Sequence, residues 1–405
     1  MIEGAEPGPR PQTHAVRSFA ALFCTDALLR SAYQVGKSPV LPVFAASLGA
    51  GDALLGLIVS VSVITGLVLK PIIGVVSDHW GRRGLLLSAV ALFTLAPFAY
   101  GWIATPHQLV GLRLAHGLAT AILGPVSVAW IVSLRADGLG TRLGWFGVAR
   151  TIGYVVGPLA GGLLLTRMDA PEIYRMVGLV SAIAFIPALL LSPPPRPAEP
   201  RERASFGQRL RKLSEVARRA PALAIVGTFE ATMYVGLYAL KTFLPLHALE
   251  LGLDLAWAGA MLSLQEGAHL VARPLTGMLA DRWSHRGCIA LGLTVIAGAL
   301  ALLPFTHGPL LVAASVLLIG VGQAMITPAA SALVALQIGE RHLGAGMGLI
   351  GSLRNAGKVV GPILGGLLIA WTSFSFGMLI LALILVPCAL WVSRMPIGAG
   401  ASLSR

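Results

Sequence analysis

The sequence predicts an all-α membrane protein in which twelve transmembrane helices form two pseudo-symmetric halves of six helices each. Three observations support this fold class. Only 12% of the 405 residues are charged and 56% are hydrophobic, with a mean hydropathy of +0.81, whereas about a quarter of the residues of a soluble domain are charged. Apolar runs of the roughly 20 residues needed to cross a bilayer recur along the chain. Segments of the first half also reappear in the second half.

The apolar runs divide the chain into two bundles with a polar linker between them. The linker, 192–221, is rich in proline and in basic residues, and it joins an N-terminal bundle (17–191) to a C-terminal bundle (222–393). Polar tails, 1–16 and 394–405, flank the bundles. The twelve predicted spans are 17–48, 53–76, 84–103, 107–133, 143–165, 174–191, 222–247, 256–279, 288–305, 309–337, 344–370 and 374–393.

The distribution of Lys and Arg predicts the orientation of these helices. With both termini in the cytoplasm, nineteen basic residues fall in cytoplasmic loops and tails, whereas only Arg167 and Arg175 fall outside. Cytoplasmic loops of membrane proteins carry such an excess, so we expect a multi-pass protein of the plasma (cytoplasmic) membrane with cytoplasmic termini. The net charge of +13 therefore requires no nucleic-acid partner.

A glycine pattern, G-x8-G-x3-G-P-x2-G-G, occurs once in each half. Glycines three or four residues apart leave one face of a helix without side chains, so a neighbouring backbone can approach closely, and the proline bends the helix. We therefore expect each half to pivot on such a helix. The pattern comprises Gly144, Gly153, Gly157, Pro158, Gly161 and Gly162 in the first half, and Gly348, Gly357, Gly361, Pro362, Gly365 and Gly366 in the second.

A second repeated pattern lies at the cytoplasmic ends of two helices, where KPIIGVVSDHWGRR (70–83) matches RPLTGMLADRWSHR (273–286). An Asp in such a loop can face the positive end of a helix, and an Arg can pair with an acid such as Asp137. We expect contacts of this kind to latch an inner gate; the alternative is that the charges only anchor the loop at the interface. The gate residues are Gly74, Asp78, Arg82, Arg83, Asp137, Gly277, Asp281 and Arg282.

Both repeated patterns, and a third motif, resemble motifs of the major facilitator superfamily. GVVSDHWGRR is similar to the family's loop between helices 2 and 3, with His79 in place of the usual Arg, and LVGLRLAHG (109–117) is similar to its helix 4 pattern, with His116 in place of Gln. The glycine pattern is similar to the helix 5 signature of the family's drug:proton antiporters, although its second copy departs from them. The resemblance implies the major facilitator fold, alternating access, and a role in proton coupling for Arg113.

The repeats also predict where the site lies. An offset of six helices gives both copies the same orientation, and transporters built from such parallel repeats bind their substrate between the halves near the bilayer midplane.

Ionisable residues inside the predicted spans are candidates for coupling, because each costs about 2.5–3.5 kcal/mol at the bilayer centre on insertion scales. Asp26 lies near the middle of the first span and is the first candidate for the coupling proton, with Arg113 as the expected cross-helix partner. An intrahelical ion pair with Arg30, one turn on, is the structural alternative. Glu230 is the repeat counterpart of Asp26. Glu266 and His269 share one helix face, as a proton path or a static polar seam.

Embedded cations and polar residues are candidates for substrate binding. Lys358 lies deep in its span without an obvious acidic partner, so we expect it to face an aqueous cavity. Lys37 and Lys241 lie toward the outer ends of their spans, where snorkelling is the simpler explanation, and Arg150 could also snorkel. The substrate-binding candidates are Arg30, Tyr33, Gln34, Tyr154, Tyr234, Tyr238, Gln265, Gln323, Asn355 and Lys358.

These features favour a proton-coupled exporter of a small organic solute or drug. The sequence has no nucleotide-binding loop, metal-ligand cluster or nucleophile elbow, so we expect neither an enzyme nor a cofactor. A second interpretation, favoured by the embedded positive charge, is an importer or facilitator of an anionic metabolite. A third is a membrane sensor without transport. The expected partners are the lipid bilayer, protons and a small-molecule substrate, with the protein as a monomer.

Overall fold

The computed structural model describes residues 11–134, 139–191, 207, 211, 221–306, 308–337 and 343–394, and this part of the chain is helical without any strand. Most of the predicted linker, residues 1–10 of the predicted N-terminal tail and residues 395–405 of the predicted C-terminal tail lie outside the described residues, whereas residues 11–16 belong to the first helix. The helices of the first half are α1 (Pro11–Lys37), α2 (Val40–Ser47), α3 (Asp52–Trp80), α4 (Arg82–Phe98), η1 (Ala99–Trp102), α5 (Pro106–Ser133), α6 (Leu139–Leu165), α7 (Ala170–Ile183) and α8 (Phe185–Leu189). Those of the second half are α10 (Pro221–Glu250), α11 (Leu255–Arg282), α12 (His285–Leu302), η2 (Leu303–Phe305), α13 (Pro309–Gln337), α14 (Leu343–Trp371) and α15 (Phe374–Arg394).

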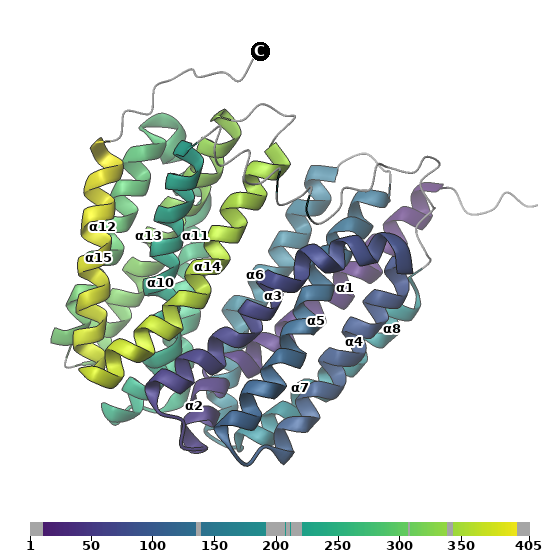
Figure 1. Cartoon of the computed structure of the whole chain (residues 1–405), viewed down its shortest axis with the longest axis horizontal. Coiled ribbons are helices and arrows are strands. Elements are labelled where there is room, and N and C mark those ends of the chain that lie inside the picture. Colours follow the sequence, from purple (N-terminus) through teal and green to yellow (C-terminus); the bar gives the residue numbers. More distant parts are fainter. Residues whose placement is uncertain are drawn as a thin grey trace, which may run out of the picture.

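The predicted fold class is confirmed, because every predicted span corresponds to a helix and the helices gather into two bundles (Figure 1). Two spans differ in being broken by proline. The first span is α1 followed by α2, with Pro39 between them, and the sixth is α7 followed by α8, which contains Pro187. A proline ring clashes with the carbonyl four residues earlier, here Ile183, where α7 ends.

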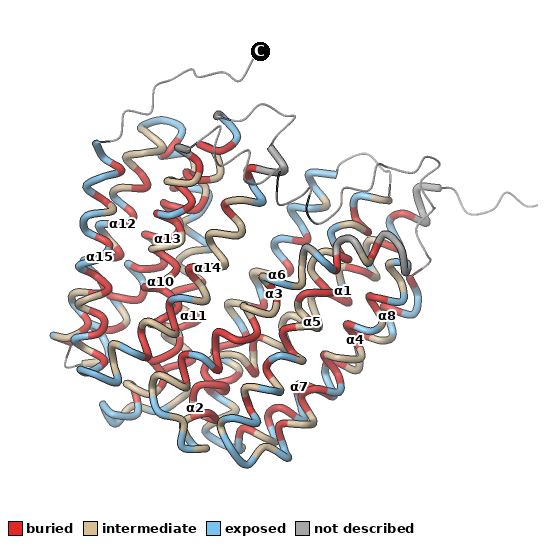
Figure 2. Tube along the Cα trace, in the orientation of Figure 1, coloured by how far each residue is buried: buried red, intermediate tan, exposed pale blue. Residues whose placement is uncertain are grey.

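Nine helical stretches of the described chain are long and apolar enough to cross a membrane. The spans outside this group are α1, α11 and α14, which carry Asp26, Glu266 and Lys358 together with other charges. Asp26 and Glu266 are buried between neighbouring helices, while large hydrophobic side chains such as Leu310 (81% exposed) and Trp371 (87% exposed) cover the outside. Figure 2 shows this contrast between buried inner and exposed outer faces. Soluble monomers rarely expose so much apolar surface, so lipid covers it.

The two halves touch through two symmetric helix pairs, α3 with α14 and α6 with α11. A Cβ atom added to Gly56 would lie 2.1 Å from the carbonyl oxygen of Pro362, and one added to Gly259 would lie 2.3 Å from that of Pro158. Hydroxyl groups add two hydrogen bonds, from Ser60 Oγ to the carbonyl of Val359 (2.8 Å) and from the amide of Leu159 to Ser263 Oγ (2.9 Å). These contacts lie at the end opposite the start of α1 and the end of α15 (Figure 1).

A capped start holds α11 at this contact. The Asp254 carboxylate accepts a hydrogen bond from the amide of Trp257 (2.6 Å) and so caps the helix directly before Gly259. The helix therefore begins one turn before the glycine that meets α6.

The repeated glycine pattern gives the predicted close approach of backbones. In α6, Gly153, Gly157 and Gly161 face α1, and a Cβ atom on Gly157 would lie 2.7 Å from that of Gln34. In α14, Gly357, Gly361 and Gly365 face α10 in the same way, whereas Gly162 and Gly366 face the opposite half. Gly144 has nothing within 4 Å of its added Cβ and does not share this packing. The pivoting itself stays a prediction.

Valine at Gly157 or Gly161 should slow transport while leaving membrane insertion intact. Forcing extra methyl groups into a packed contact costs about 1–3 kcal/mol, which would lower the rate of the conformational cycle by about 5- to 150-fold. Gly147→Val is the matched control on the same helix, because an added Cβ there meets nothing within 4 Å. Initial transport rates at equal expression measure the effect, and a wild-type rate in Gly157→Val would contradict the pivot.

Candidate functional site

A cavity of about 180 Å³ lies between the two halves, which is where the repeats predict the site. Its wall is built by α1, α3, α4, α5 and α6 from the first half and by α10 and α14 from the second. The lining residues are Arg30, Tyr33, Gln34, Lys37, Ser62, Val63, Gly66, Lys70, Phe93, Thr120, Gly124, Arg150, Tyr154, Tyr238, Asn355 and Lys358.

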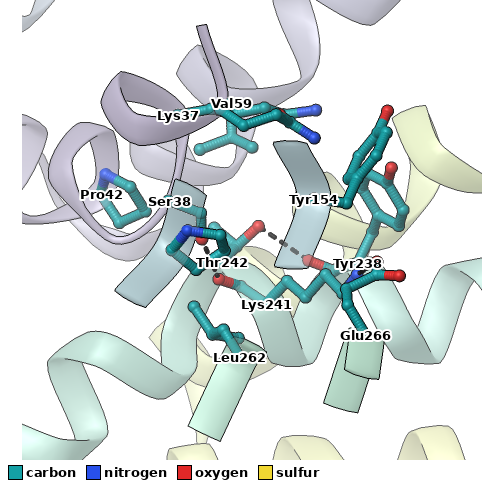
Figure 3. Close-up of a pocket in the computed structure, with 12 residues that line it drawn as sticks. Lys37, Ser38, Pro42, Val59, Tyr154, Tyr238, Lys241, Thr242, Leu262 and Glu266 are labelled. Carbon is teal, nitrogen blue, oxygen red and sulfur yellow. Dashed lines mark hydrogen bonds and ion pairs between the residues drawn. The ribbon is translucent and has the colours of Figure 1, made fainter. Parts of the chain in front are cut away.

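A smaller cavity of about 40 Å³ adjoins it, toward the end where the helix pairs α3–α14 and α6–α11 touch. The two share Gln34, Lys37, Tyr154 and Tyr238, and the smaller one adds residues of α10 and α11, including Lys241 and Glu266. Figure 3 shows the Lys241 side chain reaching toward Glu266 beside Tyr238. The two cavities together form a single candidate site at the interface of the halves.

Seven of the ten predicted substrate-binding residues line the larger cavity, and three do not. Gln265 and Gln323 are buried behind it, where Gln265 Nε2 donates to Gln323 Oε1 (2.7 Å). Tyr234 is also buried, and the Lys358 ammonium lies over its ring at 4.7 Å. The role of each residue in binding stays a prediction.

The interpretation of Lys37 and Lys241 as snorkelling residues is wrong. Both side chains turn inward, and the Lys37 ammonium lies 5.4 Å from the centre of the Tyr238 ring and 5.9 Å from that of Tyr33. Lys70 and Arg150 line the same cavity. A position near the end of a span does not decide whether a side chain reaches for the interface, because that depends on which way the helix is rotated.

Asp26 is fully buried and forms two ion pairs. Arg30 Nε lies 2.6 Å and Arg150 Nε 3.5 Å from Asp26 Oδ2, and Ser127 Oγ donates to Oδ1 (3.3 Å). The alternative of a pair with Arg30 is therefore confirmed. Within the described residues no ion pair joins Asp26 to Arg113, so the prediction that Arg113 is the cross-helix partner of Asp26 was wrong.

Arg113 instead lies in a pocket of hydroxyl groups. It donates to Ser62 Oγ (2.5 Å), to the Tyr33 hydroxyl (3.2 Å) and to the Tyr100 hydroxyl (3.5 Å). Tyr100 also shares a hydrogen bond with His116 Nδ1 (2.9 Å), which places Arg113 and His116 of the helix 4 motif in one network. The sequence analysis missed Ser62 and Tyr100.

The Asp26–Arg150 pair has a symmetric copy in the second half. Arg354 Nη2 lies 2.8 Å from Glu230 Oε1, so α14 is tied to α10 as α6 is tied to α1. The sequence contained the signal, because Asp26 and Arg150 recur as Glu230 and Arg354 at one and the same spacing. A repeated acid and a repeated base at equal offsets indicate a repeated ion pair.

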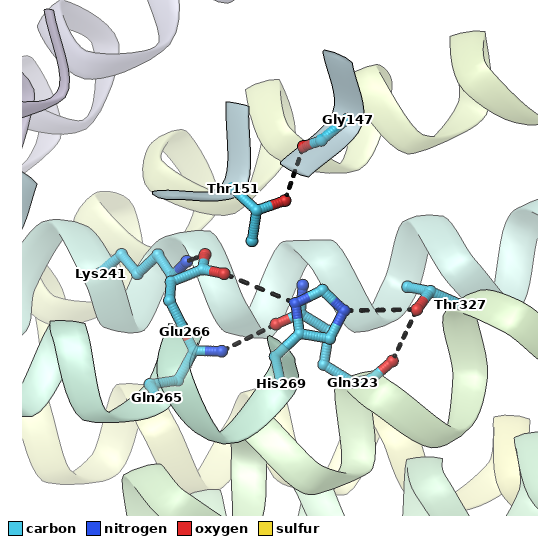
Figure 4. A network of polar contacts seen from close by, with 8 residues as sticks. All are labelled: Gly147, Thr151, Lys241, Gln265, Glu266, His269, Gln323 and Thr327. Atoms are coloured by element: carbon cyan, nitrogen blue, oxygen red, sulfur yellow. Dashed lines mark hydrogen bonds and ion pairs between the residues drawn. The ribbon is translucent and has the colours of Figure 1, made fainter. Parts of the chain in front are cut away.

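Glu266 is the centre of a third polar network (Figure 4). Its carboxylate accepts from the Lys241 ammonium and lies 3.5 Å from His269 Nδ1. The other ring nitrogen of His269 shares a hydrogen bond with Thr327 Oγ1 (3.4 Å), which donates to the carbonyl of Gln323 (3.2 Å). The predicted pairing of Glu266 and His269 on one face is confirmed, and Lys241 is the residue that the sequence analysis missed.

The predicted gate residues are described only in part. Arg82 donates to the carbonyl of Ala129 (3.0 Å) and Arg83 to that of Leu189 (3.1 Å), so both hold helices within the first half. Asp281 pairs with His285 (3.4 Å) at the end of α11, where Arg282 is the last residue, and an added Cβ on Gly277 would meet nothing within 4 Å. Asp137 lies outside the described residues, and the surroundings of Gly74 and of the Asp78 side chain are not described. The latch stays a prediction.

A family model and several known proteins each match most of this chain. A family model described as Major Facilitator Superfamily matches residues 37–266 and 231–403. The tetracycline resistance protein, class B, of Escherichia coli is 24% identical over 80% of this chain and 82% of its own length. A multi-drug resistance efflux pump PmrA homolog of Lactococcus lactis is 22% identical over 87% of this chain and 88% of its own length. An uncharacterized MFS-type transporter of Methanocaldococcus jannaschii is 23% identical over 82% and 86%.

Solved structures share the fold. The nucleoside transporter NupG superposes with a TM-score of 0.75 and 15% identity, over 93% of this chain and 98% of that one. A bacterial homolog to the human lysosomal transporter Spinster, in an inward-facing and occupied conformation, superposes with a TM-score of 0.76 and 14% identity, over 96% and 98%. At these identities the likeness concerns the fold alone.

Proposed function

Because the chain belongs to the major facilitator superfamily of transporters, we propose that it exports a small organic solute by proton-coupled alternating access. The observation that carries this proposal is the cavity between the halves, beside which the helix pairs α3–α14 and α6–α11 close one end. Breaking these contacts and forming others at the opposite end would expose the same cavity to the other side.

Export is supported by the relatives and by electrostatics. Two of the relatives are named for drug efflux or tetracycline resistance, and α6 carries the glycine pattern that resembles drug:proton antiporters. The cavity is lined by cations, which suits a negatively charged solute. An inside-negative membrane potential drives such a solute outward, by about 2.3 kcal/mol per charge for each 100 mV.

We place the coupling proton on Glu266, with His269 as its relay. Asp26 contacts two guanidinium groups, which cannot give up their protons, so protonating it would leave two cations without a counter-charge. Glu266 lines the smaller cavity, and its neighbours Lys241 and His269 are groups that can exchange protons. In this proposal Arg113 and Glu230 do not carry the coupling proton and affect coupling only through the helices that they hold together.

The orientation follows from the positive-inside distribution. We place both termini in the cytoplasm of a plasma-membrane protein, so that the closed end faces outward. A reporter that is active only in the cytoplasm should be active when it is fused after Arg405, and a reporter that is active only outside the cytoplasm should be inactive there. Activity of the second reporter would contradict this placement.

The test uses inverted membrane vesicles energised by respiration and loaded with a pH-sensitive dye. Adding an exported solute to vesicles that contain the protein should release protons from the lumen, and vesicles without the protein should show no release. Nigericin, which collapses the pH gradient, and valinomycin with potassium, which collapses the potential, separate the two driving forces. Solute accumulation that is not accompanied by any release of protons from the lumen would contradict proton coupling.

An importer or facilitator of anionic metabolites is the second candidate, and the excess of cations in the cavity is the observation that favours it. Right-side-out vesicles distinguish it from an exporter. An importer would accumulate the solute in right-side-out vesicles driven by an inward proton gradient, whereas an exporter would accumulate it in inverted vesicles.

A further inference from the structure

Three lysine side chains surround a single aromatic ring at the interface of the halves. The ammonium groups of Lys37 and Lys358 each lie 5.4 Å from the centre of the Tyr238 ring, and that of Lys241 lies 5.6 Å from it. They come from α1, α14 and α10, so both halves contribute.

The carboxylates in this region neutralise only some of the cations. Lys241 pairs with Glu266, while Arg30 and Arg150 share Asp26. Within the described residues, Lys37, Lys70 and Lys358 form no ion pair with any carboxylate.

The three unpaired lysines line one cavity within the membrane-spanning helices. Charges in such a position are costly unless they are compensated or hydrated, and their mutual repulsion adds to the cost. A negatively charged occupant of the cavity would remove both penalties.

We propose that the transported solute is a small aromatic organic anion, whose acidic group binds between Lys37 and Lys358 beside Tyr238. This inference rests on the proposed transport function only for the fate of the solute, since binding itself requires no gradient. Lys70 supplies further positive charge to the cavity wall.

The cavity also suits an aromatic ring. Tyr33, Phe93, Tyr154 and Tyr238 supply four aromatic side chains to its wall, and aromatic rings favour offset-stacked or edge-to-face contact with another ring. The volume of about 180 Å³ lies below the roughly 300–1,000 Å³ typical of pockets for drug-sized ligands. Both features indicate a compact solute that carries one ring.

A cationic solute does not fit this arrangement. No carboxylate is among the residues that line the larger cavity, and the nearby acids, Asp26 and Glu266, are already paired with protein cations. A cation would have to displace one of these partners while remaining close to Lys37 and Lys358, whose repulsion opposes its binding.

The experiment measures binding of four probes to the purified full-length protein in detergent. Benzoate and benzenesulfonate are the anions, benzamide is the neutral analogue and benzyltrimethylammonium is the cation, and all four share one phenyl ring. A ligand that binds only the folded state raises the melting temperature, and calorimetry gives its Kd. We expect the two anions, but neither of the other probes, to bind.

Three variants locate the site. Lys37→Gln and Lys358→Gln should each weaken benzoate binding by about thirtyfold, as expected when one partner of a close charge pair is lost. Lys358→Arg keeps the charge and should retain most of the binding. Arg175→Gln is the charge-matched control, because this exposed residue of α7 is outside the cavity wall.

Binding of benzyltrimethylammonium in preference to benzoate would overturn the proposal, as would unchanged benzoate affinity in both glutamine variants. Failure of both anions to bind the folded wild-type protein at the highest soluble concentration would also overturn it. The vesicle experiment is independent of these results. If benzoate binds in a lysine-dependent way but no solute drives proton release, the anion site is supported and proton-coupled export is contradicted.

Discussion

Valine at Gly259 or at Gly56 should prevent closure of the end of the transporter that we place outside, called the outer end below. An added Cβ atom would lie 2.3 Å from the Pro158 carbonyl oxygen in the first case and 2.1 Å from that of Pro362 in the second. Both neighbours are backbone atoms, so the helices themselves would have to separate. Overpacking costs about 1–3 kcal/mol, which would shift the ratio of the two states by about 5- to 150-fold toward the state with this end open.

The measurement is the reactivity of a cysteine placed at Ser60 in a variant whose three native cysteines are replaced by serine. Ser60 is fully buried against α14 when the outer end is closed. A membrane-impermeant maleimide added from outside should therefore label Ser60→Cys slowly in the otherwise wild-type protein and quickly in the Gly259→Val variant. Solute transport should fall in parallel, because the cycle requires both states.

Gly351→Val is the control for this experiment. It adds the same side chain to a membrane helix, α14, but an added Cβ at Gly351 meets nothing within 4 Å. Labelling of Ser60→Cys should then be as slow as without the substitution. Slow labelling in both Gly56→Val and Gly259→Val would show that these glycines do not control closure.

The helices and the repeat could be predicted because both depend on properties that sequence records directly. Bilayer thickness sets the length of an apolar run, and duplicated halves repeat their glycines at fixed positions. The glycine faces of α6 and α14 were predicted for the same reason, since spacing of three or four residues defines a helix face without reference to any partner. The breaks beside Pro39 and Pro187 were missed because the apolar runs continue across them.

The pair of Asp26 with Arg30 on the same helix was one of the predicted alternatives, but its cross-helix partner could not be predicted from one half alone. Arg30, Arg113 and Arg150 are all basic residues of the first half, and which of them faces α1 depends on how α5 and α6 are rotated. The rotation of α1 was equally unknown, so the sequence did not predict that the Lys37 side chain turns toward the cavity. Comparison of the two halves would have favoured Arg150, because its counterpart Arg354 has the same spacing from Glu230 as Arg150 has from Asp26.

Glutamine at Glu266 should abolish proton-driven transport while preserving the fold. The substitution removes the titrating carboxyl group with little change in volume, and its amide oxygen can still accept a hydrogen bond from Lys241. We therefore expect solute binding to persist and to lose its pH dependence. Gradient-driven accumulation in inverted vesicles should fall to the level without the protein, while exchange of labelled for unlabelled solute should continue.

Asparagine at Asp26 should have the contrasting effect. It leaves Arg30 and Arg150 without their shared counter-charge in a fully buried position, and removing one partner of a buried ion pair costs about 3–5 kcal/mol. The melting temperature of the purified Asp26→Asn protein should therefore fall markedly, and by more than that of Glu266→Gln, which removes the counter-charge of a single lysine, Lys241. Glu230→Gln breaks the symmetric pair with Arg354 and should resemble Asp26→Asn in this respect.

The two substitutions together decide which acid carries the proton. Protein that folds and reaches the membrane with Asp26→Asn should still couple solute movement to the pH gradient, at a rate limited by its amount. If Glu266→Gln instead accumulates solute against a gradient at the wild-type level, and Asp26→Asn exchanges solute but cannot accumulate it, then Asp26 is the coupling residue. In that event its ion pairs with Arg30 and Arg150 must open during the cycle, and the Glu266–His269 network is a static polar contact between α11 and α13.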